Sequence, residues 1–149
     1  MQVKENLCEV NKIVIEPENK AYNSRKIDIP DGLIDGEYYT FSAKVNQSDN
    51  GSGKCGLIIR KVGLPNSYRA ILPIENFVFR FKYDKERQAE ILIYSDVQEK
   101  THNIGAEFYN ISIVKGEAPD LYLPNINTLP KEKRGFLPPE GHYKEITPL

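Results

Sequence analysis

Hydrophobic and polar residues alternate along most of this chain, with the two-residue period of half-buried β-strands. The clearest example is residues 75–83, ENFVFRFKY, where one face carries four aromatic side chains: Phe77, Phe79, Phe81 and Tyr83. Residues 37–46, EYYTFSAKVN, alternate in the same way. No segment sustains the 3.6-residue period of an amphipathic helix, so we expect little helix.

The strand pattern recurs along the chain between turns marked by Gly, Pro and Asn. The expected strands are residues 13–15, 22–29, 37–46, 54–62, 67–72, 75–83, 89–97 and 105–115. Such a series predicts an all-β fold, a two-sheet antiparallel β-sandwich. A jelly roll is the favoured topology, although alternation alone leaves an immunoglobulin-like strand order open.

The composition changes after residue 116. The following segment carries six prolines, Pro119, Pro124, Pro130, Pro138, Pro139 and Pro148, which prevent a regular strand or helix of any length. We therefore divide the chain into a jelly-roll sandwich, residues 1–116, and a Pro-rich extended arm, residues 117–149. The arm is too apolar for a solvated linker. It either folds back on the sandwich or docks on a partner chain, and docking is favoured.

Size, charge and cysteines narrow the function classes. The 149 residues suit one domain with its own core. A formal net charge of -1 with scattered basic residues argues against nucleic-acid binding and against binding to an anionic membrane surface. Residues 1–10 do not resemble a signal peptide, so synthesis in a cytoplasm is expected. Cys8 and Cys55 are predicted to be reduced, with at least one of them buried.

A search for catalytic chemistry gives no candidate. His102 and His142 have no neighbours at metal-ligand spacing, and no nucleophile elbow or phosphate-binding loop is present. Cys55 lies mid-strand, as a buried structural thiol would. Residues 49–53, DNGSG, resemble part of a calcium loop but are better read as a flexible turn. We therefore expect no enzyme activity and no cofactor. A structural calcium ion bound largely by backbone carbonyls stays open.

Tyrosine is the distinctive surface residue, because the chain has nine tyrosines and no tryptophan. A tyrosine ring offers an apolar face to a sugar and a hydroxyl for hydrogen bonding. One hypothesis is that a shallow polar cleft for a saccharide is lined by Tyr68, Tyr94, Arg60, Arg69 and Asn103. The alternative is that most tyrosines fill the edge of the core.

Two short motifs carry a family resemblance. Residues 39–42, YTFS, and residues 110–116, NISIVKG, are similar to the first and last sandwich strands of carbohydrate-binding-module-like jelly rolls in bacteriophage and prophage tail or baseplate proteins of Gram-positive hosts. The Pro-rich arm looks like the linker that follows such domains. The resemblance covers roughly residues 6–149. It implies a jelly roll, a place in the virion tail, assembly with other tail proteins and binding to host-surface saccharide.

Together these inferences predict a tail or baseplate accessory module. It would bind host cell-wall polysaccharide weakly, and many copies on a virion would compensate through avidity. A purely structural tail component without glycan binding is the alternative, and a polysaccharide hydrolase ranks third. Self-association into a homo-oligomer is left open by the sequence.

Overall fold

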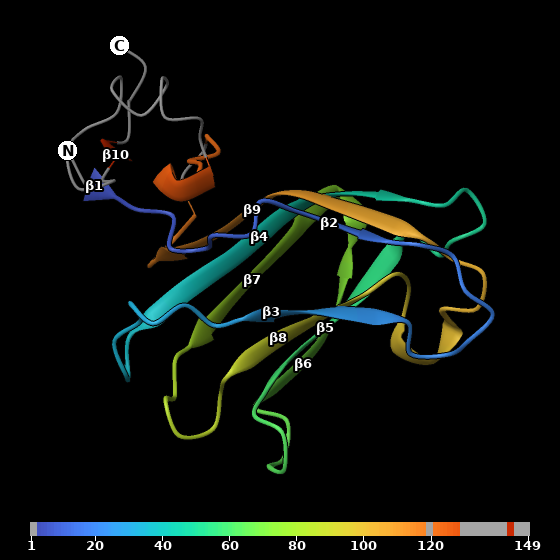
Figure 1. The fold of residues 1–149 in the computed structure, drawn as a ribbon, viewed down its shortest axis with the longest axis horizontal. Helices are drawn as coiled ribbons and strands as arrows, with labels where there is room; N and C mark the ends of the chain where they lie inside the picture. The colour runs from blue at the N-terminus through green and yellow to red at the C-terminus, as the bar shows by residue number, and fades with distance from the viewer. Residues whose placement is uncertain (1–2, 119–120, 129–142, 145–149) are drawn as a thin grey trace.

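The computed structural model describes residues 3–118, 121–128 and 143–144, and the fold is all-β (Figure 1). Eight strands form two four-stranded sheets whose pairs are all antiparallel. The β4 sheet has the order β2 (Lys12–Ile15), β9 (Ala106–Lys115), β4 (Tyr38–Gln47), β7 (Phe77–Lys82). The β5 sheet has the order β3 (Ser24–Asp28), β8 (Glu90–Tyr94), β5 (Lys54–Arg60), β6 (Tyr68–Pro73).

The strand order is that of a jelly roll. Pairing is nested along the chain: β2 pairs with β9, β3 with β8, β4 with β7 and β5 with β6. This is the pattern of one long antiparallel ribbon folded over into two layers. A further pair in each layer, β4–β9 in one and β5–β8 in the other, joins the two halves of the sheet. The jelly-roll prediction is confirmed, and the immunoglobulin-like order is excluded.

All eight predicted strands are present, with ends trimmed by a few residues. The largest difference is at the predicted strand 89–97, which ends three residues early, at Tyr94. The predicted strand 75–83 begins at Phe77 because Ile74–Asn76 form a 3-10 helix, η1. Two further 3-10 turns are η2 (Gln98–Lys100) and η3 (Ile126–Thr128). A short pair, β1 (Val3–Lys4) with β10 (Tyr143–Lys144), stands apart from both sheets and was not predicted.

The core fills the space between the sheets. Its largest fully buried side chains include Tyr39, Phe41, Phe77, Phe81 and Phe108. The alternation in β4 and β7 therefore predicted their inner faces correctly. Each such ring contributes about 1.5–3 kcal/mol of burial free energy. The rings of Phe77 on β7 and Phe108 on β9, the two strands that flank β4, meet edge-on with centroids 5.4 Å apart.

The N-terminal segment is fastened to the β4 sheet by one buried side chain. Asn6 is 1% exposed, and its Oδ1 accepts hydrogen bonds from the backbone N–H groups of Cys8 and Ile113, both at 3.0 Å. Its Nδ2 donates to the carbonyl of Ile111 at 3.1 Å. Leu7 adds a backbone bond to Ile113 at 2.9 Å. The segment therefore runs alongside β9 although some hundred residues separate the two in sequence.

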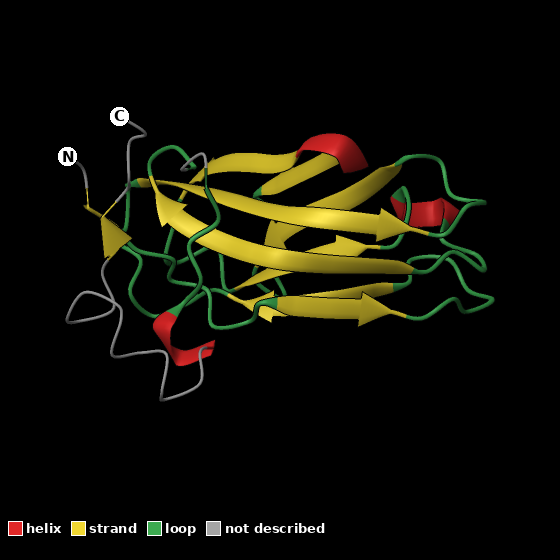
Figure 2. Ribbon diagram, turned by 90° about the horizontal axis from the view of Figure 1, so that it is seen from above, coloured by secondary structure: helices red, strands yellow, loops and turns green. Residues whose placement is uncertain are grey.

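The described part of the arm folds back onto this same segment. Asn6 Nδ2 donates a second bond, to the carbonyl of Leu123 at 2.8 Å, and Asn125 Nδ2 donates to the Asn6 carbonyl at 2.9 Å. In both views η3 lies at the same end of the sandwich as β1 (Figure 1 and Figure 2). Residues 121–128 thus follow the fold-back alternative, because Asn side chains and backbone groups find partners within the chain, while docking of the arm on a partner chain stays a prediction. Residues 129–142 and 145–149 of the arm lie outside the described residues.

Candidate ligand-binding face

Three of the five predicted site residues share the outer face of the β5 sheet. Ile58 pairs with Arg69 on one side and with Leu92 on the other. Arg60 and Tyr94 each lie two residues further along their strands, so they point to the same side of the sheet. We call the surface formed by Ile58, Arg60, Arg69, Leu92 and Tyr94 the Tyr94 face.

The floor of the Tyr94 face is apolar and closely covered. Ile58, Leu92 and Tyr94 form a cluster separate from the main core, and they are only 7%, 7% and 6% exposed. Burial raises the pKa of Tyr94, while the nearby guanidinium groups of Arg60 and Arg69 lower it in part. The phenol therefore stays protonated at neutral pH, where its hydroxyl can both donate and accept a hydrogen bond.

Charges on this side of the sheet are balanced. Arg60 Nε lies 3.7 Å from Glu90 Oε2, and an Arg69 terminal nitrogen lies 3.6 Å from Glu99 Oε2. A third ion pair, Lys26 with Asp28 at 3.4 Å, lies on the neighbouring strand β3. Because each cation faces a carboxylate, the surface does not favour a polyanion. Paired Arg and Glu side chains can instead bind neutral hydroxyl groups, with the guanidinium donating and the carboxylate accepting.

One exposed aromatic residue at the rim was missed by sequence reasoning. Tyr22 is 59% exposed and lies close enough to Tyr94 to affect the pKa of its phenol. Its backbone is in the left-handed region, with φ of 59°, which is uncommon for a bulky residue. The strain is sustained by a backbone bond from Tyr22 N–H to the Gln98 carbonyl at 2.9 Å. The sequence places Tyr22 at the start of the expected strand 22–29, but β3 begins at Ser24 and Tyr22 lies in the turn before it.

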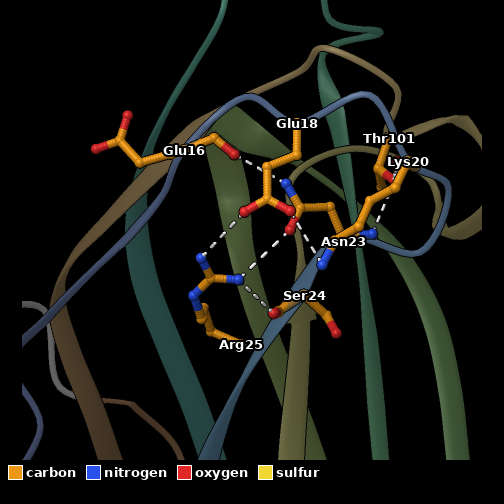
Figure 3. Close-up of polar contacts among 7 residues, drawn as sticks. All are labelled: Glu16, Glu18, Lys20, Asn23, Ser24, Arg25 and Thr101. Atoms are coloured by element: carbon orange, nitrogen blue, oxygen red, sulfur yellow. Dashed lines mark hydrogen bonds and ion pairs between the residues drawn. The ribbon is translucent and has the colours of Figure 1, made fainter.

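The loop that carries Tyr22 is held by a polar network (Figure 3). Asn23 is fully buried; its N–H donates to Thr101 Oγ1 at 2.8 Å and its Nδ2 to the Glu16 carbonyl at 2.8 Å. Thr101 Oγ1 in turn donates to the Lys20 carbonyl at 2.9 Å. These bonds join residues 16–23 to the loop after β8, so the exposed ring stands on a supported backbone. The network drawn comprises Glu16, Glu18, Lys20, Asn23, Ser24, Arg25 and Thr101.

A glycine makes room for a buried amide on the same face. A Cβ at Gly56 would lie 2.7 Å from Gln98 Nε2, so only glycine lets the Gln98 side chain lie over β5. Gln98 is 1% exposed, and among the described residues its Oε1 has no hydrogen-bond partner. Its Nε2 makes a long 3.5 Å contact with the Ala70 carbonyl. An unpaired buried acceptor therefore lies beside the Tyr94 face.

The other two predicted residues lie elsewhere. Tyr68 points inward, where its ring packs edge-on against Phe79 and Phe81 with centroids 5.5 and 6.4 Å away. Its hydroxyl accepts the Lys82 backbone N–H at 3.1 Å. Tyr68 thus fills the core edge, as the alternative reading of the tyrosines proposed. Asn103 lies in the loop after β8, where its N–H donates to the Glu18 carbonyl at 2.8 Å. The expected five-residue cleft is therefore not assembled.

The two cysteines and the turn at residues 49–53 have structural roles. Burial raises the pKa of the Cys8 thiol to about 11 and that of Cys55 to about 12, and both cysteines are free and buried as predicted. Ser52 Oγ donates to the Asp96 carboxylate, which organises the turn expected to be flexible. Within the described ranges, no three His, Cys, Asp or Glu side chains gather as metal ligands. The same residues contain no helix long and apolar enough to cross a bilayer.

Comparison of the chain with protein-family models, with curated proteins and with solved structures finds no match.

Proposed function

We propose that this chain is an accessory module of a phage or prophage tail that binds a neutral host-surface saccharide weakly through the Tyr94 face. The tail setting rests on the resemblance of residues 39–42 and 110–116 to jelly-roll tail modules. The choice of a saccharide as the ligand rests on the chemistry of the face, which has a protonated phenol, two guanidinium groups with paired carboxylates, and no net charge.

The observation that carries the proposal is the exposed ring of Tyr22. Its φ of 59° is unfavourable for tyrosine, and strained residues of this kind concentrate at functional sites. The ring is 59% exposed, so it offers the stacking surface that the buried Tyr94 ring cannot. Tyr22 would stack on a sugar ring, and Arg69 and Glu99 would bind its hydroxyls.

A purely structural tail module is the second candidate function. It is favoured by the tight cover over the floor of the Tyr94 face, where Ile58 and Leu92 are each 7% exposed. Under that proposal the ion pairs of Arg60 and Arg69 serve only to shield apolar side chains, because long charged side chains cover such surface well.

Retention on a host cell wall separates the two functions. The full chain, displayed in many copies on a particle, is applied to cell-wall polysaccharide and to a glycan array. We expect retention of the wild type and at least about ten-fold weaker retention of Tyr22→Ala, since one aromatic stacking contact is lost on every copy.

Tyr38→Ala is the matched control. Tyr38 is 47% exposed on the outer face of the β4 sheet, where Arg80 lies 4.8 Å over its ring, so its loss should leave retention unchanged. Absence of retention for the multivalent wild type, or equal loss with both variants, would leave the structural function as the better account.

A further inference from the structure

A small hollow on the opposite side of the molecule, over the outer face of the β4 sheet, has the features of a second site. Its volume is about 140 Å³. A protein cavity of about 150 Å³ by the same measure binds one benzene ring, so a hollow of this size suits a single ring. We call it the Ser42 hollow; its polar lining comes from Ser42, Lys44, Glu75, Asn76, Asn110 and Ser112.

A β-bulge shapes the hollow. Ser42 pairs with Ser112 and Lys44 pairs with Tyr109, so two residues of β9 stand opposite one residue of β4. The extra residue is Asn110, which has a φ of 50° and an exposed side chain. Asparagine tolerates this conformation better than most residues. The bulge therefore takes Asn110 out of the strand alternation and leaves it at the edge of the hollow, as bulges beside binding sites commonly do.

Two hydroxyl groups lie in the floor. Ser42 Oγ and Ser112 Oγ are 2.8 Å apart, so one donates to the other. The second proton and the remaining lone pairs are then available to a ligand hydroxyl. Lys44 and Glu75 add one cation and one anion at the rim, and neither forms an ion pair with the described residues. The hollow is thus neutral overall and rich in both donors and acceptors.

The arm supplies the apolar wall. Leu121 and Tyr122 of the arm line the hollow, and Val78 of β7 adds a further apolar surface. Leu121 is 63% exposed, so its side chain is accessible to a ligand in the hollow. An aromatic and aliphatic wall facing hydroxyls and amides suits a ring with one apolar and one polar side.

From these features we propose that the Ser42 hollow binds one terminal unit of a neutral saccharide, independently of the Tyr94 face. The two sites lie on the outer faces of different sheets, so one molecule can contact two sugar chains at once. Such a module gains avidity from each copy even though either site alone is weak.

The test is an NMR titration of the full chain with methyl glycosides of glucose, galactose and N-acetylglucosamine. We expect at least one of them to shift backbone amides of residues 42–44, 76–78 and 110–112. Lys44→Ala should weaken this binding about five-fold, the effect of losing one hydrogen bond. Lys82→Ala, an exposed lysine elsewhere on the same face, should leave it unchanged, and the spectrum of each free variant verifies its fold.

Three outcomes would overturn the proposal: no shifts with any of these probes, shifts confined to the Tyr94 face, or equal weakening by both lysine variants. A trisaccharide that binds far more tightly than its terminal unit would overturn the single-unit size. Tyr22→Ala should not affect these shifts, so failure here and failure of the Tyr94 face are separately visible.

Discussion

The outer faces of the two sheets in this jelly roll are covered by different parts of the chain. On the β5 sheet, long side chains from the sheet and its loops cover the apolar floor, so that Leu92 is only 7% exposed. On the β4 sheet, the chain that follows β9 provides part of the cover. There Thr40 Oγ1 donates to the Gly116 carbonyl, and Val114 is fully buried on the outer side.

This difference predicts that the two faces differ in how easily they unfold locally. The Tyr94 face depends on residues that are already fixed by sheet pairing, so it forms with the sandwich itself. The cover on the β4 sheet depends on contacts such as Asn6 with Leu123, which are 117 residues apart in sequence. Closing so long a loop costs entropy that only well-made contacts offset. The arm side should therefore be the first to open.

The largest expected loss of stability comes from removing the Asn6 side chain, which joins the N-terminal segment to β9 and to the arm. Asn6→Ala leaves several buried backbone groups without partners, and we expect it to lower the free energy of unfolding by about 3 kcal/mol. Urea denaturation measures this change. Alkylation of Cys8, which lies two residues from Asn6 and is 2% exposed, should also become faster while alkylation of Cys55 between the sheets changes less.

Asn127→Ala is the control for this experiment. Asn127 lies in the same arm but is exposed, so its loss should cost about 0.5 kcal/mol or less. If Asn6→Ala unfolds like the wild type, or if both thiols become reactive together, the arm side is not a separate unit of stability.

A second variant tests whether the apolar floor of the Tyr94 face is packed as tightly as a hydrophobic core. Leu92→Ala should cost about 2 kcal/mol, because the methyl groups are buried despite their position on an outer face. Val78→Ala on the outer face of the β4 sheet, at 39% exposure, should cost about 0.5 kcal/mol. Thermal or urea unfolding of both variants makes the comparison. Equal costs would mean that the two faces do not differ in packing.

The smallest effect concerns the Tyr94 phenol at alkaline pH. Burial raises the pKa of Tyr94 in the folded state above its ordinary value of 10.0. Its contribution to stability is therefore complete below about pH 10 and is lost as the pH rises toward the folded-state pKa, because the unfolded chain releases the proton first. Tyr94→Phe should reduce the loss of stability on going from about pH 9 to about pH 11.

Part of that loss should remain, since burial also raises the pKa of Tyr83 and of both thiols. Unfolding free energies of wild type and Tyr94→Phe at several pH values give the difference. An unchanged slope would mean that the phenol is hydrated in the folded state, and that the Tyr94 face is more open than its burial indicates.

Sequence reasoning located the strands well, because side-chain alternation records which face of a strand is buried. In β7 the inward set of Phe77, Phe79 and Phe81 follows directly from the pattern of residues 75–83. It placed the candidate site less well. Tyr68 and Arg69 are neighbours in the chain, yet the pleat sends them to opposite faces, and only knowledge of which face is the core decides the matter.

Some features gave no signal in the sequence. Tyr22 opens the predicted strand 22–29, yet it lies in the turn before β3, where its left-handed backbone depends on a bond to residue 98. The bulge at Asn110 interrupts the alternation of β9 by a single residue. The return of the arm depends on Asn6, a polar residue that looks like a surface position until its five hydrogen bonds are seen.

By itself, the sequence of this protein determined an all-β sandwich, the position of its strands and the faces of their aromatic residues, because these depend on local alternation. The tertiary structure decided the jelly-roll pairing, the fold-back of residues 121–128 and the backbone bond that joins Tyr22 to Gln98. Each of these depends on contacts between residues far apart in the chain, and such contacts produce no periodic pattern in the sequence.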